Sequence, residues 1–205
     1  DAPLRFRLTF AEVPAELNTP FDPYPGGLSR AWLQDEVVTV MHLPDTVTLE
    51  RRLACRYVKI ELLAQSYYDF RISDMKLEAV SSASGEGRPL EPAVDPMIAR
   101  IDGVGLKTLK ECVQTVYEDE PKRDQRLWIG DLYLESMANT YSFENHALTR
   151  RCLYLLAALA DEDGWLHATV YELPKPEPQI NQHTMDYSLL YGVTLLEYLK
   201  ATGDR

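Results

Sequence analysis

The chain of 205 residues is long enough for one large domain or two small ones, and its 45% hydrophobic and 26% charged residues are typical of a globular protein. Its 21 basic and 32 acidic side chains give a formal net charge of −11, which disfavours a nucleic-acid binder because such proteins present a basic surface. No apolar run approaches the length of a membrane span and no signal peptide opens the chain, so no membrane partner is expected. The location stays unknown, with the cytoplasm slightly favoured over secretion or the periplasm, because a chain that begins without Met can lack a signal for other reasons.

The first part of the chain has the pattern of β-strands. Residues 4–10 alternate apolar and polar side chains, as a half-buried strand does. Residues 36–43, 56–63 and 70–80 are rich in β-branched and aromatic side chains, and turn-forming residues separate the segments. We therefore predict an antiparallel β-sandwich or jelly roll over residues 1–90. Because the strands are few, we expect its first strands to be missing.

A linker and a helical region follow. Residues 81–92 are small and polar, with two glycines and two prolines, and the apolar period then changes to that of a helix. The predicted helices cover residues 95–116, 130–141, 148–159 and 184–203. A long connection, residues 161–182, precedes the last of them, and such loops are often functional. Because the connections are long and uneven, residues 91–205 fit an incomplete helical toroid better than a four-helix bundle.

The cysteines and histidines give no sign of a metal site. Cys55, Cys112 and Cys152 cannot all pair and lie in apolar surroundings, which is typical of buried free thiols. The histidines are scattered without metal-ligand spacing. We therefore expect neither a metal nor any other cofactor.

The connection before the second predicted helix, residues 119–131, reads DEPKRDQRLWIGD and is crowded with charge. A solvated charge run, with Asp131 favoured by the helix dipole, would account for the acids and bases. Trp128 does not fit that interpretation, because sugar sites place aromatic faces against pyranose rings while carboxylates and arginines bind the hydroxyls. Paired carboxylates are also the equipment of glycoside hydrolysis. The residues alone therefore indicate a sugar-binding, or even hydrolytic, helical domain.

The same segment resembles the D-x-P-x-R-E-R-x-G-W-x-G-D signature of the glycoside hydrolase family 78 α-L-rhamnosidases. Residues 32–40 and 56–64 resemble the β-sandwich that precedes the catalytic domain in this family, and residues 153–166 and 195–204 resemble its early helices. The resemblance implies an (α/α)6 toroid and a bacterial-type enzyme that hydrolyses terminal α-L-rhamnose with inversion.

The resemblance assigns roles by position. Asp124 falls at the place of the general acid, while Asp119, Arg123, Trp128 and Asp131 would contact the rhamnose. The family acid is usually Glu, and Asp is one methylene shorter, so its proton reaches the glycosidic oxygen only if backbone or substrate lies closer.

Two further departures concern the turn and the base. Leu127 stands where the signature has Gly, which raises a question about the local turn. The general base of the family is a Glu from later helices of the toroid, and no residue here matches it. We therefore expect an internal segment of a longer enzyme that is inactive by itself.

Three functions stay open on this reasoning. The first is a segment of an inverting α-L-rhamnosidase whose partner is a rhamnose-containing glycan or glycoside. The alternative is a non-catalytic carbohydrate-binding module that keeps the pocket, and a third is a structural assembly in which Trp128 and the aspartates do not converge. Uncovered apolar helix faces would favour association with a second copy or with the missing segment.

Overall fold

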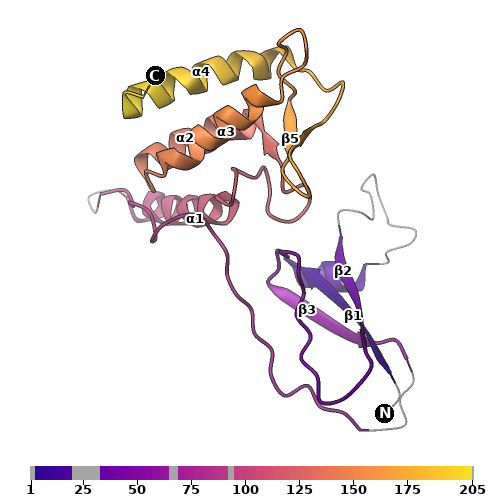
Figure 1. Ribbon diagram of the computed structural model, residues 1–205. Coiled ribbons are helices and arrows are strands. Elements are labelled where there is room, and N and C mark those ends of the chain that lie inside the picture. Colours follow the sequence, from indigo (N-terminus) through magenta and orange to yellow (C-terminus); the bar gives the residue numbers. More distant parts are fainter. Residues whose placement is uncertain (1–2, 20–32, 65–68, 92–94, 205) are drawn as a thin grey trace. The chain divides into compact units, whose positions relative to one another are not determined.

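The computed structural model describes residues 3–19, 33–64, 69–91 and 95–204, which belong to two compact units, Asp1–Glu78 and Ala79–Arg205 (Figure 1). Within the described residues, the first unit holds a three-stranded antiparallel sheet, and the second holds four α-helices with a small three-stranded sheet. The chain is therefore α+β, as predicted. The division at residue 90 stays a prediction.

The sheet of the first unit has β1 at its centre, paired antiparallel to β2 and to β3. The elements are β1 (Leu4–Ala11), the 3-10 helix η1 (Pro14–Asn18), β2 (Gln34–Val40) and β3 (Tyr57–Leu62). Phe6 of β1 stands opposite Val38 of β2 and Leu62 of β3. The strands predicted from the first three segments are confirmed, with small shifts at their ends.

Residues 70–80 do not form a strand, which corrects the fourth prediction. Leu77 and Met75 are 73% and 61% exposed, and the segment pairs with no strand among the described residues. Phe70 meets Phe6 edge-on, with ring centroids 5.5 Å apart. Residues of this type favour a strand only where a neighbouring backbone completes the hydrogen-bond ladder, and composition does not reveal that neighbour.

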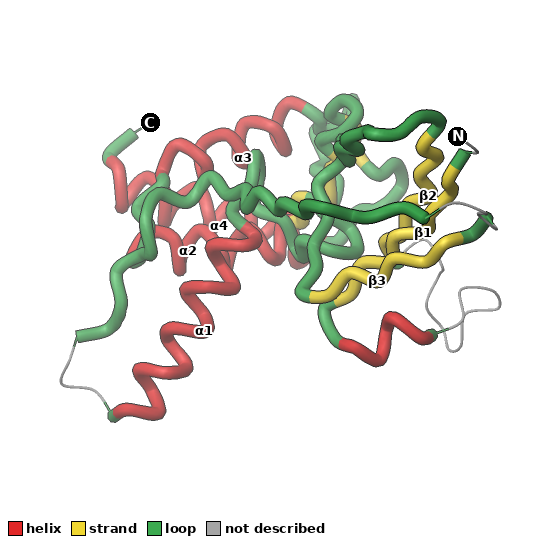
Figure 2. The backbone as a smooth tube through the Cα atoms, turned by 90° about the horizontal axis from the view of Figure 1, so that it is seen from below, coloured by secondary structure: helices red, strands yellow, loops and turns green. Residues whose placement is uncertain are grey.

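The helices of the second unit lie close to their predicted positions. They are α1 (Pro96–Cys112), α2 (Ile129–Tyr141), α3 (His146–Ala158) and α4 (Met185–Thr202). Asp95 caps α1 by accepting the Met97 N–H at 2.7 Å, and Gly203 ends α4 with a φ of 72°. Helices α2, α3 and α4 pack on one another and α1 lies against α2 (Figure 2).

Helix α1 ends earlier than its apolar pattern predicts. Instead of continuing to Val116, the chain turns after Cys112, and Val113 forms an isolated bridge with Tyr117. Val113, Val116 and Tyr117 are all buried in the core, so their apolar spacing continues although the helix does not. The Gln114 side chain donates to the carbonyl of Glu111 at 2.8 Å and supports this helix end.

A small antiparallel sheet in the order β4-β5-β6 ties the 119–131 segment to the long connection before α4. Its strands are β4 (Leu127–Trp128), β5 (Thr169–Tyr171) and β6 (Glu177–Pro178). Residues 161–182 are therefore not wholly a loop, although strands this short have no readable period. The core of the unit joins the helices to this sheet and includes Val113, Tyr117, Leu127, Ile129, Leu132, Cys152, Leu156 and Val170.

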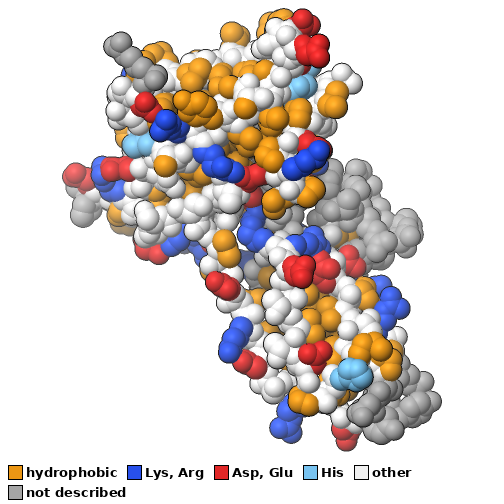
Figure 3. Space-filling model, viewed as in Figure 1, with side chains coloured by type: hydrophobic (Ala, Val, Ile, Leu, Met, Phe, Trp, Pro, Cys, Tyr) orange, Lys and Arg blue, Asp and Glu red, His pale blue; other side chains and the backbone are white. Residues whose placement is uncertain are grey.

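Helices α1 and α4 keep apolar side chains at the surface. On α1, Ile101 and Val104 are exposed, and on α4 Leu189, Leu196 and Leu199 are exposed. Hydrophobic side chains gather over the part of the surface that carries α4 (Figure 3). Self-association through these faces stays a prediction. Among the described residues, every helix is too short or too polar to pass through a membrane.

Candidate active site

A loop braced by its own hydrogen bonds carries the first half of the 119–131 segment. The Asp119 N–H donates to the Arg126 carbonyl at 3.0 Å, and the Arg126 N–H donates to Asp119 Oδ1 at 3.2 Å. Inside the loop, Gln125 donates its N–H to the Glu120 carbonyl at 3.1 Å and its side-chain Nε2 to the Pro121 carbonyl at 2.6 Å. These bonds fix the backbone from which Arg123 and Asp124 project.

Leu127, which replaces the glycine of the resembling signature, leaves the turn unstrained. It is fully buried, pairs with Val170, and its carbonyl accepts the Thr169 hydroxyl at 3.0 Å. The positive φ of this segment falls instead on Gln125, at 53°. Leu127 has the extended backbone of a strand, a conformation that a residue with a side chain adopts without strain. The replacement of glycine therefore does not disturb the backbone that leads to Trp128.

Asp119 is half-buried, and burial is the largest cause that raises its pKa, to about 6. The backbone N–H groups of Arg126 and Glu120 lower the pKa, while the charges of Asp124 and Glu120 raise it. Asp119 therefore changes its charge close to neutral pH. An ionised carboxylate at this place is a strong acceptor for sugar hydroxyls.

Asp124 lies between two guanidinium groups. Its Oδ1 is 3.4 Å from Arg123 Nε and its Oδ2 is 3.8 Å from Arg126 Nη1, and its side chain is only 12% exposed. Arg123 also pairs with Glu120, so that carboxylate belongs to the ion-pair network of the loop. The orientation of Asp124 is set by these neighbours.

Trp128 and Asp131 lie at the start of α2. Trp128 provides the N-cap backbone without a side-chain capping bond, and Asp131 sits in the first turn, where the helix dipole favours a carboxylate. Burial raises the pKa of Asp131, and its own backbone N–H opposes that rise. The Trp128 Nε1 is buried and has no hydrogen-bond partner among the described residues.

Two residues that the sequence analysis did not select join this cluster. Glu135 follows Asp131 by one helical turn, and burial, with the charge of Asp131 as the second cause, raises its pKa to about 9. The spacing of four residues from Asp131 was the available signal, since such positions share a helix face. Tyr187 of α4 meets the Trp128 ring edge-on, with centroids 6.4 Å apart. Tyr187 lies among apolar residues of a predicted helix, so the sequence did not indicate it as a site residue.

The structure thus connects the predicted residues in two groups. In the first group, the Trp128 ring meets that of Tyr187, and the charges of Asp131 and Asp119 both help to raise the pKa of Tyr187. Arg123 and Asp124 occupy the braced loop, coupled to Asp119 through the charge of Asp124. The sugar-binding role of all five stays a prediction.

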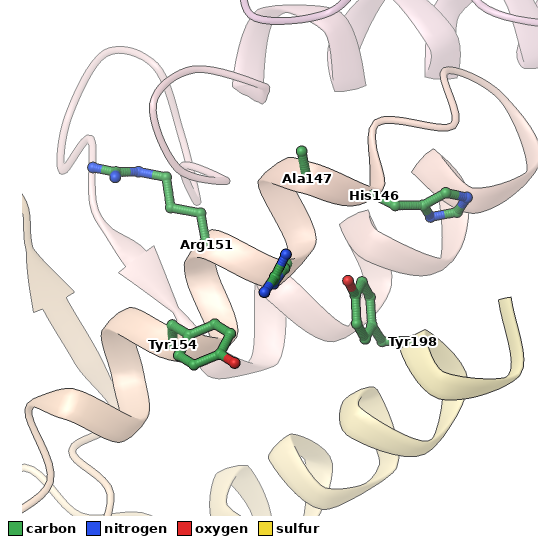
Figure 4. A pocket seen from close by; sticks show the side chains of 6 residues that line it. His146, Ala147, Arg151, Tyr154 and Tyr198 are labelled. Carbon is green, nitrogen blue, oxygen red and sulfur yellow. The ribbon is translucent and has the colours of Figure 1, made fainter. Parts of the chain in front are cut away.

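A shallow hollow lies elsewhere in the helical unit. It has a volume of about 600 Å³ and is lined by His146, Ala147, Arg150, Arg151, Tyr154 and Tyr198 (Figure 4). Its cations are already engaged, because Arg150 pairs with Asp204 at 3.6 Å and Arg151 pairs with Glu172. We therefore assign the hollow no role in the chemistry. In the described part of the chain, no three His, Cys, Asp or Glu side chains are arranged to hold a metal ion.

Comparisons with known proteins agree on one family. Residues 1–79 match the model of the glycosyl hydrolase family 78 alpha-rhamnosidase N-terminal domain, and residues 93–194 match that of the bacterial alpha-L-rhamnosidase 6 hairpin glycosidase domain. A solved rhamnosidase from Klebsiella oxytoca with rhamnose bound is 40% identical, with a TM-score of 0.92. The alignment covers 100% of this chain and 40% of that one, so the chain spans well under half of that rhamnosidase. No curated protein sequence matches.

These matches give the two units their architectural names. The sheet of the first unit is part of a β-sandwich, and the four helices of the second are part of a six-hairpin (α/α)6 toroid, as predicted.

Proposed function

The chain belongs to glycosyl hydrolase family 78, and we propose that the protein carrying it hydrolyses terminal α-L-rhamnose from glycans or glycosides. The observation that carries the proposal is the cluster of Asp119, Asp131 and Trp128 beside the braced loop of Asp124. The Klebsiella rhamnosidase, which is 40% identical over the whole of this chain, has rhamnose bound, and this supports the choice of sugar.

In the proposed pocket, Asp119 and Asp131 accept hydrogen bonds from ring hydroxyls. Trp128 and Arg123 form its walls, the first against the apolar face of the ring and the second as a donor. The partial burial of both carboxylates supports this role, because a hydrogen bond is stronger where less water competes.

The proposed reaction is a single displacement with inversion. Asp124 protonates the glycosidic oxygen as the leaving group departs, while a carboxylate on the opposite face of the ring takes a proton from the attacking water. We assign that base to no residue of this chain, because in the family it comes from later helices. Residues 1–205 alone would therefore bind the sugar without turning it over.

Asp124 can be tested as the acid with two aryl α-L-rhamnosides, one with a good and one with a poor leaving group, and the full-length protein. Asp124→Asn should lower kcat far more on the poor leaving group, which needs the proton, than on the good one. Asp163→Asn is the matched control, since Asp163 lies in an exposed turn. Equal rates for the wild type and Asp124→Asn on both substrates would dismiss Asp124 as the acid.

A non-catalytic carbohydrate-binding module is the second candidate. The observation in its favour is the shorter acid at position 124, held by Arg123 and Arg126 on the loop. This candidate predicts that the full-length protein binds L-rhamnose but hydrolyses neither aryl rhamnoside. Turnover that Asp124→Asn removes would exclude it.

A further inference from the structure

Gly130, the second residue of α2, lies directly against the ring of Tyr187 from α4. A Cβ at this position would be 2.6 Å from Tyr187 Cζ and 2.7 Å from its hydroxyl oxygen, well inside van der Waals contact. The backbone of Gly130 is helical, so no unusual φ requires a glycine here. Because glycine inside a helix normally costs stability, its use here is explained by the close approach of Tyr187.

The approach brings the Tyr187 hydroxyl beside the acids of the candidate site. The ring meets Trp128 edge-on at 6.4 Å. Burial is the largest cause that raises the pKa of Tyr187, and the charges of Asp131, Asp186 and Asp119 raise it further. Carboxylates of the braced loop, of α2 and of its own helix are therefore near enough for their charges to act on Tyr187.

Two other tyrosines of α4 have hydroxyls that form hydrogen bonds within the protein, as a structural role requires. The Tyr191 hydroxyl donates to the Leu153 carbonyl at 2.9 Å, and the Tyr198 hydroxyl donates to Asp204 Oδ2 at 3.0 Å. Both groups are used inside the protein. The Tyr187 hydroxyl makes no hydrogen bond within the described residues, although its ring packs against the core. Packing alone would be served equally well by phenylalanine.

We propose that Tyr187 is a substrate-binding residue, whose hydroxyl forms a hydrogen bond with a sugar hydroxyl that Asp131 or Asp119 also contacts, and that Gly130 makes room for it. The inference rests on the proposed function and adds a residue and a reason for the glycine. A hydroxyl can both donate and accept, so it complements carboxylates that only accept.

The test uses the full-length protein and a series of aryl α-L-rhamnosides, each lacking one ring hydroxyl. For the complete substrate, Tyr187→Phe should lower kcat/KM about tenfold, the loss of one hydrogen bond. For the one analogue that lacks the contacted hydroxyl, wild type and Tyr187→Phe should be equal. The control Tyr191→Phe should lower the melting temperature and leave this pattern unchanged. Equal kcat/KM for Tyr187→Phe and wild type on every substrate, or the same loss on all of them, would overturn the inference.

Failure of the proposed function gives a different result. If the wild type turns over no rhamnoside, the hydrolase proposal fails, and the affinity for L-rhamnose measured by calorimetry decides the inference. Weaker binding by Tyr187→Phe would then support it, whereas equal binding, or none by the wild type, would overturn it.

Gly130→Ala provides a second probe. The atoms it displaces are the far end of the Tyr187 side chain, so the fold should survive while the hydroxyl moves. We expect kcat/KM to fall at least tenfold for Gly130→Ala, and the same change in a Tyr187→Ala background to have almost no further effect. Losses that simply multiply in the double variant would show that Gly130 acts independently of Tyr187 and would overturn its role.

Discussion

The two ends of the 119–131 segment hold their carboxylates in different ways. In the loop, Asp124 is flanked by Arg123 and Arg126, and ion pairs and internal hydrogen bonds fix its place. At the start of α2, Asp131 and Glu135 share a helix face, and the charges of Asp131 and Asp119 add to the burial that raises the pKa of Glu135 to about 9 and keeps it neutral. The loop thus fixes the position of Asp124 through compensated charge. In the acidic region, which consists of Asp119, Asp131 and Glu135, burial and like-charged neighbours disfavour ionisation and raise the pKa values.

Within the acidic region, we expect the largest loss of activity from a substitution of Asp119. Asp119→Asn keeps an oxygen that can accept the Arg126 N–H, so the loop should stay closed, but the substrate loses a charged acceptor. We expect kcat/KM to fall about 100-fold at pH 8, on the order of 3 kcal/mol. Steady-state kinetics on an aryl α-L-rhamnoside would measure this, beside Asp163→Asn. An unchanged kcat/KM would show that Asp119 does not bind the sugar.

Glu135 offers a stability test of the same region. Its folded-state pKa of about 9 lies above the ordinary 4.5, so its contribution to stability is complete below pH 4.5 and is lost as the pH rises towards 9. Glu135→Gln removes this loss and should stabilise the protein by up to about 5 kcal/mol at pH 8 and hardly at all at pH 4.

The unfolding midpoints of the wild type and Glu135→Gln across pH 4–9 would measure that effect. The exposed Glu162→Gln serves as control and should follow the wild type at every pH. A difference that does not grow with pH would mean that Glu135 is not held neutral by burial.

The sugar affinity should itself report the pKa of Asp119. Because this pKa is raised to about 6, the carboxylate is ionised above that pH and protonated below it. The Kd for L-rhamnose should therefore weaken about tenfold from pH 7 to pH 5. Calorimetry would show the change, and Asp119→Asn should show a flat profile over the same range. A flat wild-type profile would contradict the assignment.

The sequence could predict much of the fold because its signals are local. The cap at Asp95, the proline at 96 and the glycine at 203 mark helix ends wherever the rest of the chain lies. The early end of α1 and the unpaired residues 70–80 were missed for a different reason. Both depend on segments distant in sequence: the Ser82 N–H donates to the Val113 carbonyl at 2.8 Å where α1 has ended, and no described strand lies alongside residues 70–80. Apolar spacing does not contain that information.

The same division applies to the candidate site. The five predicted residues lie within one contiguous motif, so a resemblance over residues 119–131 indicates them together. Tyr187 lies far along the chain, on α4, and joins them only in the folded structure, where its ring lies against Gly130 and Trp128. Glu135 looks like an ordinary helix-surface acid until the burial of its side chain is known.

The loop region can be tested at Arg126, where the smallest effect is expected. Its guanidinium lies 4.1 Å from the centroid of the Tyr171 ring, donates to Gln179 Oε1 at 3.1 Å, and reaches Asp124. Lysine keeps the charge, but it cannot stack a planar group on Tyr171 and at the same time hold both Gln179 and Asp124. Arg126→Lys should therefore weaken the interactions of this side chain by about 1 kcal/mol. That cost should appear as a severalfold lower kcat on the poor leaving group, because Asp124 becomes less well oriented. Lys122→Arg is the control. If Arg126→Lys instead weakens rhamnose binding and leaves kcat unchanged, Arg126 acts on the sugar pocket rather than on the acid.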